Sequence, residues 1–144
     1  MLQENEVSRT PPSPLLVLLE GRVFAEFGGL LASLPLLRRL PRGDGHAVMV
    51  VPGFGGGDGS TAILRRALTA LGYSAYGWGQ GRNLGMRSGM KDALATRLRG
   101  LHESHGGKVS LIGWSLGGVF VREMARAQPA LVRRVFTLGS PING

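Results

Sequence analysis

The residues best suited to chemistry gather around Ser115, which has glycine two positions before it and two positions after it. The segment before this serine, Val109 to Ile112, is a short apolar run of the kind that forms a buried strand. The segment after it, 116–125, repeats apolar residues at every fourth position, which predicts an amphipathic helix. The sequence therefore places a G-x-S-x-G motif, with Gly113 and Gly117 as its glycines, between a strand and a helix.

A serine in this position has a specific chemical use. A serine hydroxyl is a weak nucleophile, and it attacks a carbonyl carbon only when it is held rigidly beside a base. A sharp turn between strand and helix lifts the Ser115 oxygen clear of the backbone, and the flanking glycines avoid the collisions that a Cβ would cause. The start of the helix directs free N–H groups and a partial positive charge toward the serine. The competing interpretation is a glycine-rich turn that carries a serine by chance.

A second glycine-rich loop, Pro52 to Gly59, follows another apolar run. Such a loop lets backbone N–H groups approach a ligand closely. It has neither the lysine of a phosphate-binding loop nor the spacing of a dinucleotide-binding loop. A loop whose glycines serve flexibility alone is the other interpretation. Further along, Arg82 and Asn83 are candidates to line a substrate entrance, although we expect a polar loop of this kind to be exposed.

Three stretches of the chain resemble the α/β-hydrolase superfamily: GWSLGG around Ser115, HAVMVVPGFGGGDGS upstream and FTLGSPING downstream. The resemblance is to bacterial esterases and lipases, and it extends from Gly45 to Gly144. It implies that Ser115 is the nucleophile and that the backbone N–H groups of Phe54 and Leu116 form an oxyanion hole. It also implies an acyl-ester or lipid-like substrate and a Ser–Asp/Glu–His triad in that chain order.

Two members of that triad have no counterpart in this chain. After Ser115 there is no histidine, and the only carboxylate, Glu123, falls on the helix that follows the serine. His46 precedes the serine, which is the wrong order, and a histidine at a strand start is usually structural. His102 and His105 fall in the last turn of a helix, where the helix dipole favours them as caps. We therefore expect the N-terminal half of a hydrolase, inactive or nearly so by itself.

The elements that position these residues alternate between strand and helix. Apolar runs predict strands at 47–51, 73–78, 109–112 and 132–138, with helical periodicity between them and helix caps within 58–61. This order predicts an α/β fold, a parallel sheet with helices on both faces. The loops at the carboxyl ends of the strands then share one edge, where such folds bind ligands, and the last strand is expected to leave an open edge.

The N-terminal region has a different character. Residues 1–14 are polar and unpatterned, which predicts a flexible tail. Residues 15–42 form an apolar, leucine-rich helical segment that charged residues interrupt, so we do not expect a transmembrane helix. Two interpretations remain open: this helix packs on the hydrolase body, or residues 15–40 lie on a membrane surface or a partner. An incomplete α/β-hydrolase domain then occupies 43–144.

Composition limits the function classes. The chain has 144 residues and no cysteine, which excludes disulfides, a thiol nucleophile and zinc–thiolate sites. The net charge is +8, but the basic residues are scattered in ones and twos, so we expect no nucleic-acid partner. No metal or organic cofactor is indicated. The acidic start is not a secretory signal, so we expect a cytoplasmic protein, with membrane association through 15–40 as the alternative.

Two functions of different classes remain open. The first is a serine hydrolase of carboxylic esters, similar to an esterase or lipase, in which Ser115 attacks the acyl carbon. The second is a non-catalytic half-domain that binds a partner chain or a membrane surface through residues 15–40 and the open sheet edge. The sequence indicates no oligomeric state.

Overall fold

The structure, a computed structural model, describes residues 35–36 and 39–141. The chain divides into two compact units, Met1–Leu37 and Arg38–Gly144, and the second contains every element discussed below. The predicted tail at 1–14 lies outside the described residues, and so does most of the predicted helical segment at 15–42, of which only 35–36 and 39–42 are described. The domain boundary at residue 43 stays a prediction.

Four parallel strands form one sheet: β1 (Ala47–Val51), β2 (Ser74–Gly77), β3 (Val109–Trp114) and β4 (Val132–Leu138). Their order across the sheet is β2-β1-β3-β4, so β1 and β3 are central. These two central strands are the apolar runs of the sequence, and they are buried almost throughout, as parallel strands covered on both faces require. The prediction of a parallel sheet is confirmed.

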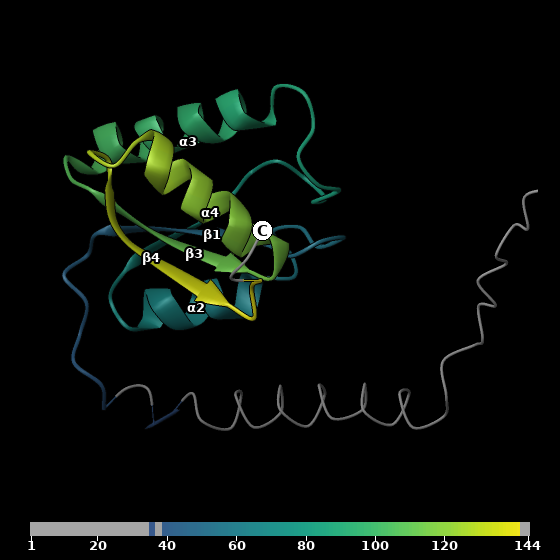
Figure 1. Ribbon diagram of the computed structural model, residues 1–144. Coiled ribbons are helices and arrows are strands. Elements are labelled where there is room, and N and C mark those ends of the chain that lie inside the picture. The colour runs from purple at the N-terminus through teal and green to yellow at the C-terminus, as the bar shows by residue number, and fades with distance from the viewer. Residues whose placement is uncertain (1–34, 37–38, 142–144) are drawn as a thin grey trace, which may run out of the picture. The chain divides into compact units, whose positions relative to one another are not determined.

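Helices cover both faces of this sheet (Figure 1). Helix α2 (Ala62–Ala70) packs its leucines against one face. Helices α3 (Met90–His105) and α4 (Leu116–Ala127) pack on the other face, where the larger core lies. Among the described residues, no helix is both long and apolar enough to cross a bilayer. The most deeply buried side chains of the larger core include Met49, Trp78, Leu94, Leu98, Leu111 and Val121.

All four strands run in the same direction, so their carboxyl ends meet at one edge of the sheet. The loop after β1, the bend between β3 and α4, and the loop after β4 are neighbours at that edge. Parallel sheets of this kind bind ligands at the carboxyl ends of their strands. Ser115 lies at this edge, directly after β3.

Candidate active site

The backbone bends sharply at Ser115. Its φ is 50° and its ψ is −118°, and it is the one non-glycine residue with positive φ in the described part of the chain. A residue with a Cβ is held in such a conformation at a cost of about 1–3 kcal/mol, so its surroundings must impose it. The Ser115 N–H donates to the carbonyl of Leu138 at 2.8 Å, and its own carbonyl accepts from the N–H of Gly118 at 2.9 Å. The serine therefore lies in the tight turn that connects β3 to α4.

Glycine is required on both sides of this bend, because backbone atoms occupy the places where a Cβ would lie. A Cβ on Gly113 would collide with the carbonyl of Gly117 and would lie 2.5 Å from the Cα of Gly118. A Cβ on Gly117 would collide with the carbonyl oxygen of Val51 and would lie 2.7 Å from that of Pro52. The start of α4 thus packs directly on the backbone at the end of β1, and this contact brings the serine beside the loop that follows β1.

A cleft of about 280 Å³ opens between that loop and the bend. Phe54 and Trp114 form apolar walls, with 70% and 49% of their surfaces exposed. Leu116 follows the serine, but its side chain packs against the core and does not line the cleft. No backbone acceptor is recorded for the N–H of Phe54 or of Leu116 among the described residues. The residues that line the cleft are Gly53, Phe54, Gly56, Ser60, Trp114 and Ser115.

Asn83 holds the loop that carries Phe54. Its side chain is fully buried and donates through Nδ2 to the carbonyl of Pro52 at 2.8 Å. Its backbone carbonyl accepts from the N–H of Gly55 at 2.6 Å, and its N–H donates to the carbonyl of Gly56 at 2.7 Å. The expectation of an exposed Asn83 is therefore wrong, because this residue joins two loops that are distant in sequence. No local pattern around Asn83 indicates that role.

Asp58 connects the same loop to the end of β2. The sequence predicts helix caps at this point, but the N-cap residue Thr61 makes no side-chain cap hydrogen bond. The Asp58 carboxylate instead accepts the N–H groups of Trp78 at 3.0 Å and of Gly79 at 3.2 Å. Strand β2 ends at Gly77 rather than at Trp78 as predicted, since the next N–H is bonded to this carboxylate.

Ser140 supports the bend from the β4 side, where its Oγ donates to the carbonyl oxygen of Ser115 at 2.7 Å. Ser140→Ala is expected to lower the free energy of unfolding by about 1 kcal/mol, because the carbonyl of Ser115 loses one of its two donors and keeps only the N–H of Gly118. Urea denaturation measures the change. The control is Ser104→Ala near the end of α3, which removes a longer bond of 3.2 Å to the carbonyl of Leu101 and an exposed contact of 3.0 Å to His105 Nδ1. Equal losses for the two variants would contradict a supporting role for Ser140.

None of the three histidines of the chain lines the cleft. His102 Nδ1 lies 2.8 Å from the carbonyl oxygen of Gly107, and His105 Nδ1 lies 3.1 Å from that of Leu101. His105 therefore bonds a carbonyl in the last turns of α3, in agreement with the prediction of a cap, whereas His102 bonds a carbonyl just beyond the helix. Within the described residues, no group of three or more His, Cys, Asp or Glu side chains is placed to hold a metal ion.

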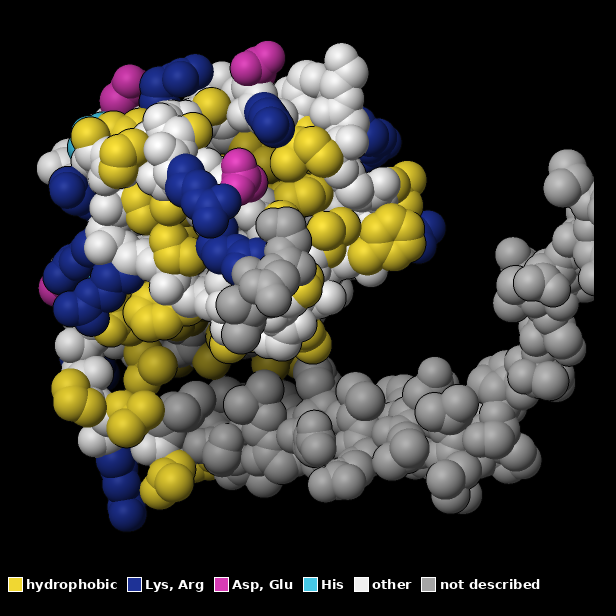
Figure 2. Space-filling view, in the orientation of Figure 1, with side chains coloured by type: hydrophobic (Ala, Val, Ile, Leu, Met, Phe, Trp, Pro, Cys, Tyr) yellow, Lys and Arg dark blue, Asp and Glu magenta, His cyan; other side chains and the backbone are white. Residues whose placement is uncertain are grey.

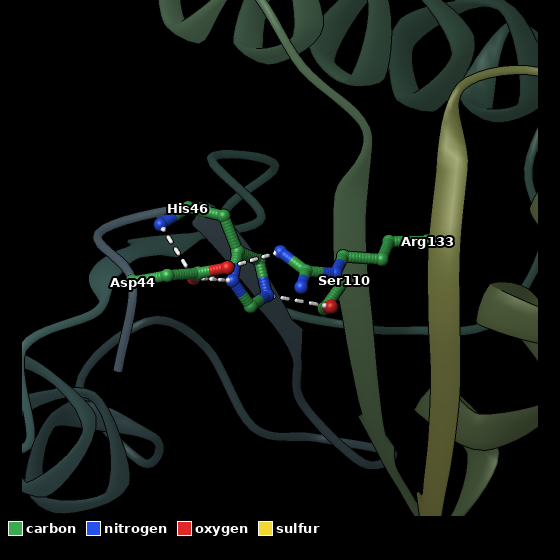
Figure 3. Close-up of polar contacts among 4 residues, drawn as sticks. All are labelled: Asp44, His46, Ser110 and Arg133. Atoms are coloured by element: carbon green, nitrogen blue, oxygen red, sulfur yellow. Dashed lines mark hydrogen bonds and ion pairs between the residues drawn. The ribbon is translucent and has the colours of Figure 1, made fainter. Parts of the chain in front are cut away.

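His46 belongs to a Ser–His–Asp hydrogen-bond chain near the amino ends of the strands (Figure 3). Its Nε2 lies 2.8 Å from Ser110 Oγ, and its Nδ1 bonds the carboxylate of Asp44, which also accepts from Arg133 at 2.6 Å. The hydrogen bond from His46, followed by that from Arg133, lowers the pKa of Asp44 well below its usual range, so Asp44 stays ionised. Ser110 is buried within β3 and lacks the positive φ that marks Ser115, so we do not assign a second nucleophile to this hydrogen-bond chain.

No family model and no curated protein matches the sequence. Among solved structures, the chain is similar to the crystal structures of Bacillus licheniformis lipase BlEst2 in its propeptide form and in its mature form. Each comparison has 25% sequence identity and a TM-score of 0.57. The fold is esterase/lipase-like. The matched region covers 74% of this chain, 24% of the propeptide-form chain and 45% of the mature-form chain, so this chain spans less than half of either one.

Proposed function

We propose that the chain carries the nucleophile half of a serine hydrolase that acts on carboxylic esters, with Ser115 as the nucleophile. The observation that carries the proposal is the strained backbone of Ser115, since a positive φ at a residue other than glycine clusters at functional sites. Two glycines and two loops hold this serine where it lines a cleft. The esterase/lipase-like fold supports the same reaction class.

The N–H groups of Phe54 and Leu116 form the proposed oxyanion hole. Attack of the Ser115 oxygen on an ester carbon turns the carbonyl oxygen into an anion, which needs donors already in place. Phe54 lies in the loop that shares the cleft with the serine, and Leu116 is the first residue of α4. Neither N–H has a recorded backbone acceptor among the described residues, and the positive end of the α4 dipole adds to the stabilisation of an anion.

The walls of the cleft favour an acyl substrate. Phe54 and Trp114 present large apolar surfaces to solvent beside the serine, and the bound acyl chain of an ester or a lipid would cover them. No side chain that lines the cleft is titratable, so a charged substrate would find no partner there. An uncharged carboxylic ester with an apolar acyl chain is therefore the substrate class that we propose.

The reaction needs a base that the cleft lining does not supply. The base takes the Ser115 proton as its oxygen attacks the acyl carbon, and then returns a proton to the departing alcohol. The acyl group is then bound to the Ser115 oxygen. With help from the same base, water attacks this acyl group and releases the carboxylic acid and the free serine. We propose that the histidine and its acid partner are supplied by a segment other than the described residues, and that the chain by itself reacts slowly.

Labelling with a fluorophosphonate probe tests the role of Ser115. We expect slow covalent labelling of the 144-residue chain, accelerated by added imidazole as an external base. Ser115→Ala should reduce the labelling to background, whereas Ser60→Ala, which alters another serine of the same cleft, should leave it unchanged. The proposal is overturned if labelling survives in Ser115→Ala, or if imidazole produces none.

A non-catalytic half-domain that binds a partner chain is the second candidate. Strand β4 favours it, because within the described residues this strand is paired only with β3. Phe136 and Leu138 on this edge strand are 47% and 44% exposed. An open edge with exposed apolar side chains is a template for a further strand. Absence of labelling together with self-association that Phe136→Lys abolishes would favour this function.

A further inference from the structure

A groove of about 460 Å³ lies on the face of the sheet that α2 covers in part, and it extends toward the amino ends of the strands. Its floor is apolar: Val48, Ile112 and Phe136 contribute from three strands, and Leu68 contributes from α2. Phe136 remains 47% exposed. Within the described part of the chain, β4 is packed against α4, and α4 lies on the opposite face of the sheet. On the side shown in Figure 2, Lys and Arg side chains lie next to exposed hydrophobic side chains over β4.

Two arginines reach this groove from one short stretch of β4. The pairing of β3 with β4 shifts register between Val109 and Ser110, so that two residues of β4 oppose one of β3. Such a bulge re-aims side chains, and here both Arg133 and Arg134 line the groove. Figure 3 shows Arg133 directed at Asp44, beside the ring of His46.

The charges that line the groove do not cancel. Asp44 is the one acidic residue among the lining residues, and it is already bonded to Arg133 and His46. For Arg42 and Arg134, no hydrogen bond or ion pair is recorded within the described part of the chain. The groove thus combines an apolar floor with an excess of positive charge, which is complementary to an anion that has an apolar tail.

We propose that this groove binds a small amphipathic carboxylate, such as a free fatty acid of medium length. The carboxylate would pair with Arg134, whose planar guanidinium matches it with two parallel hydrogen bonds, and the alkyl chain would lie along Ile112 and Phe136. The volume falls within the range of about 300–1,000 Å³ that is typical of small-molecule sites, most of whose lining is apolar with a few polar groups. The site does not depend on Ser115, which lies beyond the opposite end of β3.

Calorimetric titration of sodium decanoate into the 144-residue chain, below the concentration at which micelles form, tests the proposal. We expect saturable binding of one decanoate per chain. Decanol, which has the same chain length without the charge, should bind about tenfold more weakly, because it loses the charge-assisted hydrogen bonds. Equal binding of the two compounds, or no saturable binding of decanoate, overturns the proposal.

Substitutions locate the binding. Arg134→Gln should weaken decanoate binding about tenfold while circular dichroism shows an unchanged fold, because the side chain is exposed on an edge strand. Arg99→Gln removes an exposed arginine of α3 that does not line the groove and should have no effect. Ser115→Ala should bind as the parent chain does, so the result is independent of the proposed hydrolase. Unchanged binding in Arg134→Gln, or binding only to phosphatidylglycerol vesicles, contradicts a carboxylate site.

Discussion

Gly117→Ala is expected to lower the free energy of unfolding by about 3 kcal/mol or more, a large part of the stability of a small domain. The new Cβ would collide with the carbonyl oxygen of Val51 and lie 2.7 Å from that of Pro52. Backbone atoms at the end of a central strand have nowhere to move, since β1 is hydrogen-bonded on both sides. Relief requires α4 to shift away from the sheet, and that shift would also displace the proposed nucleophile.

Urea denaturation followed by circular dichroism measures this loss. The matched control is Gly100→Ala in α3, where a Cβ meets nothing within 4 Å. Alanine is the better helix former, so the control should gain about 0.5–1 kcal/mol. Similar stabilities for the two variants would show that α4 does not approach β1 as closely as the structure places it.

Asn83→Asp is expected to lower the free energy of unfolding by about 3 kcal/mol or more at neutral pH, although the two side chains have nearly the same shape. The amide Nδ2 that donates to the Pro52 carbonyl becomes an oxygen, which in its ionised form only accepts. A buried charge would then face a carbonyl oxygen without a donor between them. The loop that carries Phe54 should loosen, and labelling of Ser115 should slow with it.

The loss of stability in Asn83→Asp should be larger at neutral pH than at acidic pH. Burial disfavours the ionised form of the new carboxyl, so its pKa is higher in the folded than in the unfolded chain. The variant is therefore least destabilised below the unfolded pKa of about 3.9, where the protonated acid can donate to Pro52, and its deficit grows as pH rises above that value. The control is Gln80→Glu on the same loop, whose amide makes only a 3.5 Å contact to Trp78. The buried hydrogen bond would be contradicted if the loss of stability in Asn83→Asp did not change with pH, or if Gln80→Glu lost as much stability.

The order of strands and helices and the bend at Ser115 could be predicted because both depend on residues that are close in sequence. The apolar runs at 47–51 and 109–112 formed β1 and the first four residues of β3, and four-residue periodicity formed α4. Glycine at both flanks of a serine, between a strand and a helix, indicates a turn that few other residues tolerate. These signals depend on backbone sterics and on the burial of apolar side chains, and both can be read from residues that are close together in sequence.

The contacts that hold and surround the bend were decided only by the tertiary structure. Asn83 bonds the carbonyl of Pro52, 31 positions away in sequence, and Ser140 bonds that of Ser115, 25 positions away. The ring of His46 bonds Ser110, which is 64 positions away in sequence. Together with the arginines of β4, this ring lines a groove that no motif predicts. A hydrogen bond of this kind needs only one suitable donor and one acceptor, so neither partner has a characteristic local pattern. The pairing of β1 with β2 and β3, and of β3 with β4, brings the partners within reach.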